Sequence, residues 1–282
     1  MSQVCILTDS TAQFPIPAFA GRKLVNVIPL HIQIDKTLYK KSEGIKAADL
    51  PPTLQGNGIP KAVPPSLEEF EQMYTHLGQY YEEIVAIFHT ADLSKTYENG
   101  LEAAANIRGQ TKIEVIDAQT TSTGLGLVVQ AAAAAAEAGT SSTEIDDMIR
   151  SLLPRMYSVF CIRGLSYLHH SGYLGEAQAI VGEYLKILPI YILEEGKLVH
   201  TLKARNNRHL VDLLHEFLGE FIHLEHIALL QGAPPFENET RALRERLVLD
   251  FVDTPISEHT ISAELASIIG PHTLGMFAQQ SE

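Results

Sequence analysis

The sequence predicts an α/β protein built from two domains. Short β-rich runs alternate with segments of helical periodicity, which is typical of a mainly parallel sheet covered by helices. At about 150 residues per domain, a chain of 282 residues corresponds to two domains. Apolar residues make up 45% of the chain, which is enough to fill a core in each domain. We expect an N-terminal α/β domain with a parallel sheet over residues 1–155 and a C-terminal α/β domain over 156–282.

The N-terminal half begins with an apolar run at 4–8, which predicts a strand that stops at Asp9. Residues 25–34 predict a strand at an edge or with a bulge, because Pro29 cannot donate a backbone hydrogen bond to a neighbouring strand. Residues 40–65 are rich in Pro, Gly and Lys and predict a long loop. Loops of this length are usually functional or mobile.

The rest of this half alternates between helices and strands. Ser66 and Glu69 form a capping box at the start of a helix whose apolar face ends at Leu77. Further strands are expected at 84–88 and 113–116, and further helices at 94–107, up to Gly139 and from Ser141 onward.

The alternation continues after Pro154, where we expect the domain boundary. Glu195-Gly196 is a hairpin turn signal between strands at 187–192 and 197–201. The other expected strands are 158–162, 226–231 and 264–269, and the expected helices run up to Tyr184 and over 209–221 and 238–249. The last of these strands is followed by Gly270-Pro271-His272 and a short apolar tail.

The charge balance excludes some partners. The chain has 21 basic and 34 acidic side chains, a formal charge of −13, which argues against nucleic acid and against an anionic membrane. Cys5 and Cys161 lie far apart in apolar runs, so a reducing cytoplasm is favoured. The first residues lack a basic signal-peptide region, and no apolar stretch reaches the ~20 residues of a membrane helix, so we expect no stable membrane insertion.

Several motifs of cofactor and metal sites are absent from the sequence. There is no GxxxxGK[ST] phosphate loop, no GxGxxG dinucleotide fingerprint, no GxSxG nucleophile elbow and no HExxH. We therefore expect no cofactor and no bound metal ion.

Three hydroxyl-rich loops follow predicted strands. They are Asp9-Ser10-Thr11, Leu93-Ser94-Lys95-Thr96 and the segment 117–122. Because the carboxyl ends of parallel strands meet at one edge of a sheet, these loops predict a single polar crevice. A helix that starts at Ser94 would offer its N-terminus to a carboxylate or phosphate. The alternative is that Ser10 and Ser94 only cap the turns that follow them.

Two further candidates lie in the C-terminal half. Arg205 belongs to the basic segment 203–208, which is either a solvated charge run or a docking point for an anionic ligand or an acidic partner. His272 lies on an irregular segment and is either structural or a donor to a carboxylate.

Taken in order, several segments resemble the DegV family of bacterial fatty-acid-binding proteins. The resemblance runs from end to end of the chain and depends on the order and spacing of the segments. The segments are ILTDST at 6–11, VIPLHIQID at 27–35, PPSLEEF at 64–70, LSKTYENGLEAA at 93–104, VIDAQTTSTGLG at 115–126, LSYLHHSGYLG at 165–175, LPIYILEEGKL at 188–198, KARNNR at 203–208 and IGPHTLG at 269–275.

The resemblance implies two α/β domains with an apolar tunnel between them that holds one long-chain fatty acid. It further implies that the chain is not an enzyme, but presents the bound carboxylate to an ATP-dependent fatty acid kinase subunit. Ser94 matches the family's carboxylate-binding serine, His272 its C-terminal histidine and Arg205 an arginine of the usual basic segment. The expected ligand-binding residues are Ser10, Ser94, Lys95, Thr96, Arg205 and His272, with no catalytic and no metal-binding residue.

Three departures from the family pattern make this chain a divergent member. Ala62 and Val63 replace a Thr-Ser pair, Lys95 replaces a glycine, and Tyr173 replaces an arginine. Lys95 is a candidate to supply the lost positive charge. Two alternatives remain: a binder of another small apolar anion, and a stand-alone hydrolase or phosphotransferase that uses Asp9 or Asp117 with His272.

Overall fold

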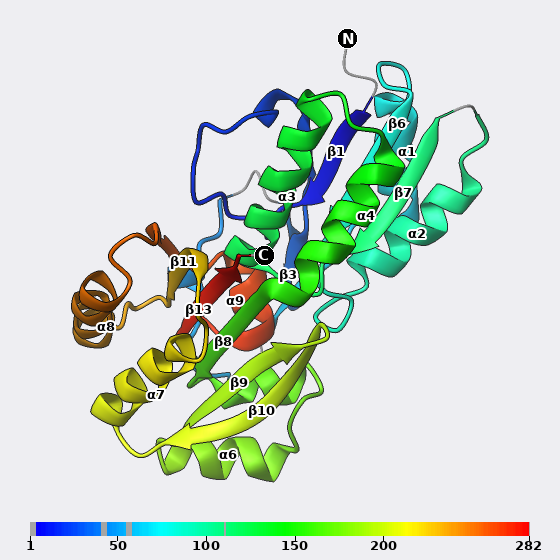
Figure 1. The fold of residues 1–282 in the computed structure, drawn as a ribbon. Helices are drawn as coiled ribbons and strands as arrows, with labels where there is room; N and C mark the ends of the chain where they lie inside the picture. The colour runs from blue at the N-terminus through cyan, green and yellow to red at the C-terminus, as the bar shows by residue number, and fades with distance from the viewer. Residues whose placement is uncertain (1–3, 41–43, 55–57, 110, 282) are drawn as a thin grey trace. The chain divides into compact units, whose positions relative to one another are not determined.

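The structure is a computed structural model that describes residues 4–40, 44–54, 58–109 and 111–281 (Figure 1). The chain divides into two compact units. The first unit holds the chain up to His31 together with Val63–Pro154 and Glu195–Lys197, and the second holds Ile32–Ala62, Arg155–Glu194 and the chain from Leu198 onward.

The first unit contains a four-stranded parallel sheet in the order β2-β1-β6-β7. Its strands are β1 (Val4–Asp9), β2 (Val25–Ile28), β6 (Glu83–Phe88) and β7 (Lys112–Asp117). The expected strand 25–34 is two strands, because the chain leaves the sheet at Pro29 and Leu30 and resumes as β3 (His31–Ile34). The edge position of β2 agrees with the expectation from Pro29.

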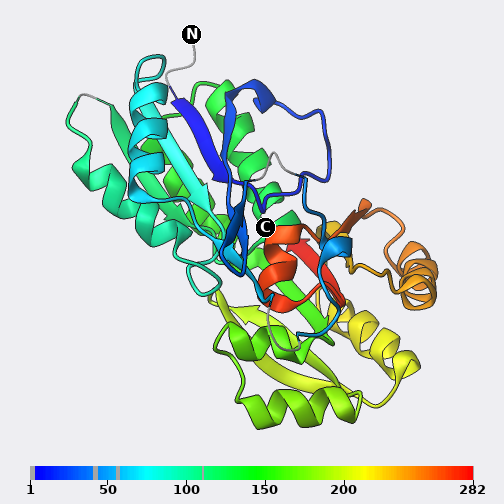
Figure 2. The same cartoon turned by 180° about the vertical axis from the view of Figure 1, so that it is seen from behind.

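Helices cover both faces of this sheet (Figures 1 and 2). They are α1 (Leu67–Leu77), α2 (Thr96–Asn106), α3 (Ser122–Glu137) and α4 (Ser142–Leu152), with the short helix η1 (Arg22–Leu24). Helices α1 and α2 pack on one face through a core that includes Leu7, Phe70 and Phe88, and α3 and α4 contact β1 and β6. The capping box of Ser66 and Glu69 is confirmed, since each side chain bonds the backbone N–H of the other residue.

The second unit contains a six-stranded mixed sheet in the order β10-β9-β8-β13-β11-β12. Its strands are β8 (Met156–Ile162), β9 (Leu188–Glu194), β10 (Lys197–Ala204), β11 (Leu224–Gln231), β12 (Ile256–Thr260) and β13 (Thr273–Gln280). The turn between β9 and β10 has positive φ at Glu195 and Gly196, as the hairpin signal predicted.

The helices of the second unit are α5 (Leu165–His170), α6 (Glu176–Tyr184), α7 (Asn207–Gly219), α8 (Glu237–Asp250) and α9 (Ala263–Ile269), with η4 (Leu153–Arg155) between the units in sequence. Helices α7 and α8 pack on one face of the sheet through alternate residues such as Val159, Cys161 and Met276.

Two expectations for the end of the chain are wrong. Residues 264–269, expected as a strand, form α9, whose residues are all buried and whose first turn is capped by Ser262. A short apolar run that is buried on all sides has no periodicity to distinguish a helix from a strand. The expected apolar tail is β13, which lies between β8 and β11 near the centre of the sheet.

Residues 32–62 differ from the expected domain assignment, because they belong to the second unit. They contain β4 (Thr37–Tyr39), η3 (Ala47–Asp49) and β5 (Pro60–Val63), and β4, β3 and β5 form a small sheet. The Tyr167 hydroxyl donates to the Pro51 carbonyl at 2.6 Å, which ties this segment to α5. The predicted loop 40–65 thus has regular structure, and residues 41–43 and 55–57 lie outside the described residues.

Within the described part of the chain, no helix is both long and apolar enough to cross a membrane.

Candidate functional site

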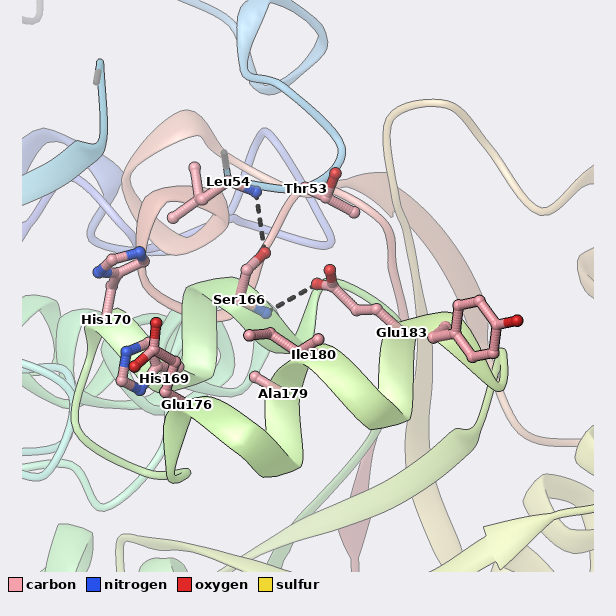
Figure 3. A pocket seen from close by; sticks show the side chains of 10 residues that line it. Thr53, Leu54, Ser166, His169, His170, Glu176, Ala179, Ile180 and Glu183 are labelled. Atoms are coloured by element: carbon pink, nitrogen blue, oxygen red, sulfur yellow. Dashed lines mark hydrogen bonds between the residues drawn. The ribbon is translucent and has the colours of Figure 1, made fainter. Parts of the chain in front are cut away.

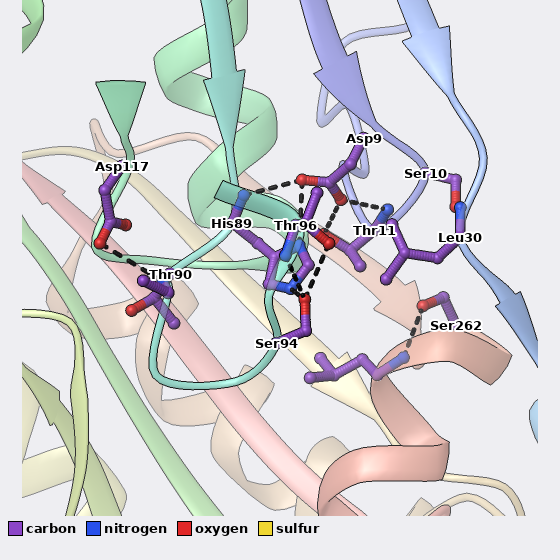
Figure 4. Close-up of polar contacts among 12 residues, drawn as sticks. Asp9, Ser10, Thr11, Leu30, His89, Thr90, Ser94, Thr96, Asp117 and Ser262 are labelled. Atoms are coloured by element: carbon purple, nitrogen blue, oxygen red, sulfur yellow. Dashed lines mark hydrogen bonds and ion pairs between the residues drawn. The ribbon is translucent and has the colours of Figure 1, made fainter. Parts of the chain in front are cut away.

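The loops that follow β1, β6 and β7 meet at the carboxyl edge of the first unit's sheet (Figure 4). Asp9 ends β1, His89 follows β6 directly and Asp117 ends β7. The backbone N–H of Ala91 donates to Asp117 Oδ2 at 3.3 Å, and that of Thr90 donates to the Thr120 carbonyl at 2.9 Å. The structure therefore brings together the three hydroxyl-rich loops that the sequence placed at strand ends.

Asp9 is the buried acid of this edge, with no exposed surface. Its Oδ1 accepts the backbone N–H of Thr11 at 2.9 Å and the Thr11 hydroxyl at 2.6 Å. Its Oδ2 accepts the backbone N–H of His89 at 2.7 Å and lies 3.0 Å from His89 Nδ1. Burial by itself raises the pKa of Asp9, but the charge and hydrogen bonds of His89 and the Thr11 hydroxyl outweigh it and lower the pKa below its usual value. Asp9 is therefore a carboxylate.

His89 connects this carboxylate to Ser94. The ring is fully buried, and its Nε2 lies 2.7 Å from Ser94 Oγ, on the side opposite Asp9 (Figure 4). The Asp9 carboxylate can only accept, so the neutral tautomer that pairs with it carries its proton on Nδ1, although the 3.0 Å contact does not have the geometry of a hydrogen bond. Nε2 is then the acceptor for the Ser94 hydroxyl. Asp9, His89 and Ser94 form one chain of polar contacts.

Ser94 lies in the turn before α2. The Ser94 hydroxyl is half-buried, contacts Thr96 Oγ1 at 2.8 Å and accepts the backbone N–H of Thr96 at 3.2 Å. The expected helix start at Ser94 is wrong by two residues, because Lys95 occupies the N-cap position and Thr96 is the first helical residue. Two hydroxyls therefore lie at the N-terminus of α2, where the helix dipole favours an anion.

The other expected ligand-binding residues of this unit have different surroundings. Ser10 is buried, and its Oγ accepts the backbone N–H of Leu30 at 3.0 Å, which joins the loops after β1 and β2. Lys95 is exposed. Ser10 thus joins the loops after β1 and β2, while the exposed Lys95 is the neighbour of Ser94 in sequence.

Arg205 and His272 belong to the second unit. Arg205 is exposed and precedes α7, and its backbone N–H donates to His209 Nδ1 at 3.1 Å. The His272 ring lies 4.6 Å from the Phe236 ring, and Arg163 lies over the same phenylalanine. Burial and the Arg163 charge lower the pKa of His272, which favours the neutral ring at pH 7. Their roles toward a ligand stay predictions from the resemblance.

His89 is the residue that sequence reasoning missed. Its position directly after a predicted strand, in line with Asp9 after the neighbouring strand, was the available signal.

A second candidate site is a pocket of about 590 Å³ in the second unit, beside α5 and α6 (Figure 3). Its size suits a small-molecule ligand. The Ser166 hydroxyl accepts the backbone N–H of Leu54 at 2.9 Å, and Glu183 accepts that of Ser166 at 2.7 Å. Its lining residues are Thr53, Leu54, Ser166, His169, His170, Glu176, Ala179, Ile180, Glu183 and Tyr184.

Among the residues that the structure describes, no group of three or more His, Cys, Asp or Glu side chains is placed to hold a metal ion.

Comparison with known proteins places this fold in a family. A family model described as "Uncharacterised protein, DegV family" matches residues 3–281. A DegV domain-containing protein of Caldanaerobacter subterraneus is 27% identical over 285 residues, which cover 99% of this chain and 100% of the relative. A DegV domain-containing protein of Deinococcus radiodurans is 26% identical and covers 97% of each chain.

Solved structures give the same result. A DegV family protein of Thermus thermophilus, described for its fatty acid binding, has a TM-score of 0.81 at 26% identity and covers 99% of this chain and 100% of its own. The B3 protein of the Streptococcus pneumoniae fatty acid kinase, solved with linoleic acid, has a TM-score of 0.83 at 20% identity with the same coverage. The expected α/β class and the expected resemblance are confirmed.

Proposed function

The chain belongs to the DegV family, and from this premise we propose that it binds a long-chain fatty acid and presents the carboxylate to a separate kinase subunit. That subunit carries ATP and transfers the phosphoryl group to form an acyl phosphate. This chain contributes binding and orientation to that transfer, and neither a catalytic group nor a cofactor. The proposal places the protein in the cytoplasm, where the free buried thiols of Cys5 and Cys161 stay reduced.

The observation that carries the proposal is the pair of hydroxyls at the start of α2. Ser94 Oγ and Thr96 Oγ1 lie 2.8 Å apart, and the helix N-terminus adds a partial positive charge. A fatty acid carboxylate needs donors of this kind, because its charge must be compensated when water is removed. Each methylene buried behind the head group contributes roughly 0.8 kcal/mol, so the chain supplies most of the affinity.

A second candidate is the binding of another small apolar anion. Lys95 at the N-cap position of α2 and Tyr173 in place of the family's arginine favour it. An exposed ammonium group next to Ser94 suits a head group with more negative charge than a carboxylate.

The first test is native mass spectrometry of the freshly purified protein, followed by solvent extraction and identification of what is released. A stoichiometric fatty acid supports the proposal. A protein that arrives empty and stays empty with added oleate or palmitate contradicts it and favours the other anion.

The second test compares Ser94→Ala with Ser141→Ala in an oleate titration. Loss of a hydrogen bond to a charged group weakens binding about 10-fold or more. Ser141 caps α4, a helix of the same 11-residue length as α2, so this variant removes a helix-start hydroxyl of the same unit away from the crevice. Equal affinities of the two variants would contradict a role of Ser94 in binding.

A further inference from the structure

Asp9, His89 and Ser94 stand in the order acid, imidazole, hydroxyl. The distances are 3.0 Å from Asp9 Oδ2 to His89 Nδ1 and 2.7 Å from His89 Nε2 to Ser94 Oγ. We propose that Ser94 is also a catalytic nucleophile that hydrolyses carboxylic esters, with His89 as its general base and Asp9 as the positioning residue. This activity goes beyond fatty acid binding and does not depend on it.

The contacts exceed what a structural role requires. Asp9 already accepts three hydrogen bonds, from the Thr11 N–H, the Thr11 hydroxyl and the His89 N–H, so the imidazole is not needed to satisfy the buried carboxylate. Ser94 already accepts the Thr96 N–H at the helix start, and that bond needs no histidine. What the imidazole adds is a basic nitrogen within hydrogen-bond distance of the hydroxyl, which is the requirement for activating a serine.

The protonation pattern fits this task. A ring proton on Nδ1, the nitrogen that lies 3.0 Å from the Asp9 carboxylate, leaves Nε2 free to take the proton of Ser94. When Nε2 takes that proton, the resulting imidazolium has its Nδ1 3.0 Å from the buried Asp9 carboxylate. The half-buried Ser94 is the member of the three that a substrate reaches, since Asp9 and His89 have no exposed surface.

The start of α2 supplies the electrostatics that the reaction needs. The helix begins two residues after Ser94, and its dipole places a partial positive charge beside the Ser94 hydroxyl. The buried Thr96 hydroxyl lies 2.8 Å from Ser94 Oγ and adds a polar partner for the nucleophile.

The reaction balances without any co-reactant except water. Ser94 Oγ forms a bond to the ester carbonyl carbon while its proton moves to His89 Nε2. The bond from that carbon to the alcohol oxygen then breaks, and His89 returns the proton to the departing alcohol. Water attacks the acyl-serine in the same way, which releases the acid and restores Ser94. The substrates are esters with a good leaving group, and a preference for long acyl chains would rest on the proposed fatty acid site.

The test uses the full chain, a fluorophosphonate probe and p-nitrophenyl octanoate. We expect the probe to add one phosphonyl group in the intact mass, mapped by peptide sequencing to Ser94, and we expect measurable release of p-nitrophenol. Ser94→Ala should abolish both signals, while Ser141→Ala should keep both. Absence of probe from Ser94, or equal hydrolysis by Ser94→Ala and wild type, overturns the proposal.

The roles of the other two residues have their own variants. His89→Gln keeps a polar side chain but no base, and we expect ester hydrolysis to fall about 100-fold or more. Asp9→Asn should lower kcat and leave KM nearly unchanged, because it disturbs the tautomer of the base and not substrate binding.

Ser94→Cys keeps a nucleophile at this position and should still gain acyl mass from the ester. Unchanged hydrolysis in His89→Gln, with the melting temperature of wild type, would contradict the assignment even if oleate binding is confirmed.

Discussion

The carboxylate of Asp9 lies 3.0 Å from the imidazole Nδ1 of His89, a residue 80 positions further along the chain. The parallel pairing of β1 with β6 explains this contact. Thr8 is in register with Ile87, so the residues that follow the two strands leave the sheet side by side. Ser94 reaches the same ring because the chain turns after His89 before α2 begins.

Asp9→Ala should lower the free energy of unfolding by about 3 kcal/mol, because it removes the acceptor for Thr11 and His89 and leaves buried donors unpaired. Urea unfolding at pH 7 measures the change. Asp212→Ala is the control, since Asp212 pairs with Arg246 at the surface and its loss should have little effect. Equal midpoints for the two variants would show that the Asp9 network does not stabilise the fold.

Gly100→Ala should destabilise the first unit by about 1–2 kcal/mol, although alanine is the better helix former. A Cβ at this position would lie 2.7 Å from Phe88 Cε2 and 3.3 Å from Phe70 Cε1, so α2 would have to move away from β6. Gly219→Ala, in α7, is the matched control because nothing lies within 4 Å of its Cβ. Thermal unfolding compares them, and a Gly100→Ala variant as stable as wild type contradicts the close packing.

Acid should weaken the second unit through His226 in β11. Burial, and then the charge of His259, lower the pKa of His226 to about 4 from 6.5. Because its pKa is lower in the folded protein, His226 binds a proton more readily in the unfolded chain. The contribution of neutral His226 to the free energy of unfolding is therefore complete above pH 6.5 and is lost as the pH falls toward 4. Its size is of the order of 3 kcal/mol.

Urea unfolding of wild type and His226→Gln at several pH values between 8 and 4.5 isolates this contribution. We expect the stability of wild type to fall more steeply with decreasing pH than that of the variant. Parallel pH profiles would mean that His226 does not carry the effect.

Lys95→Ala should weaken ligand binding about 3- to 10-fold, because it removes the positive charge nearest to Ser94 in sequence. Lys23→Ala is the charge-matched control, because Lys23 is an exposed lysine of the same unit, in η1. Fluorescence competition with oleate at low ionic strength measures both variants. If the two affinities agree, Lys95 does not replace the lost charge of the family pattern.

Local signals in the sequence were enough for much of the first unit. The Ser66–Glu69 box and Ser141 marked the starts of α1 and α4, because a cap is satisfied within four residues. The β1 and β6 segments were recognisable because inner strands of a covered parallel sheet are continuous apolar runs.

The sequence by itself therefore determined the α/β class, most helices and strands, the family resemblance and the position of the hydroxyl-rich loops at strand ends. Only the tertiary structure decided that His89 lies between Asp9 and Ser94, that 264–269 is a helix and that 273–280 is an inner strand. It also assigned residues 32–62 to the second unit. The physical reason is the sequence separation of the residues that interact. Helix caps and hydrophobic periodicity involve residues a few positions apart, whereas strand pairing and burial join segments that are far apart in the chain.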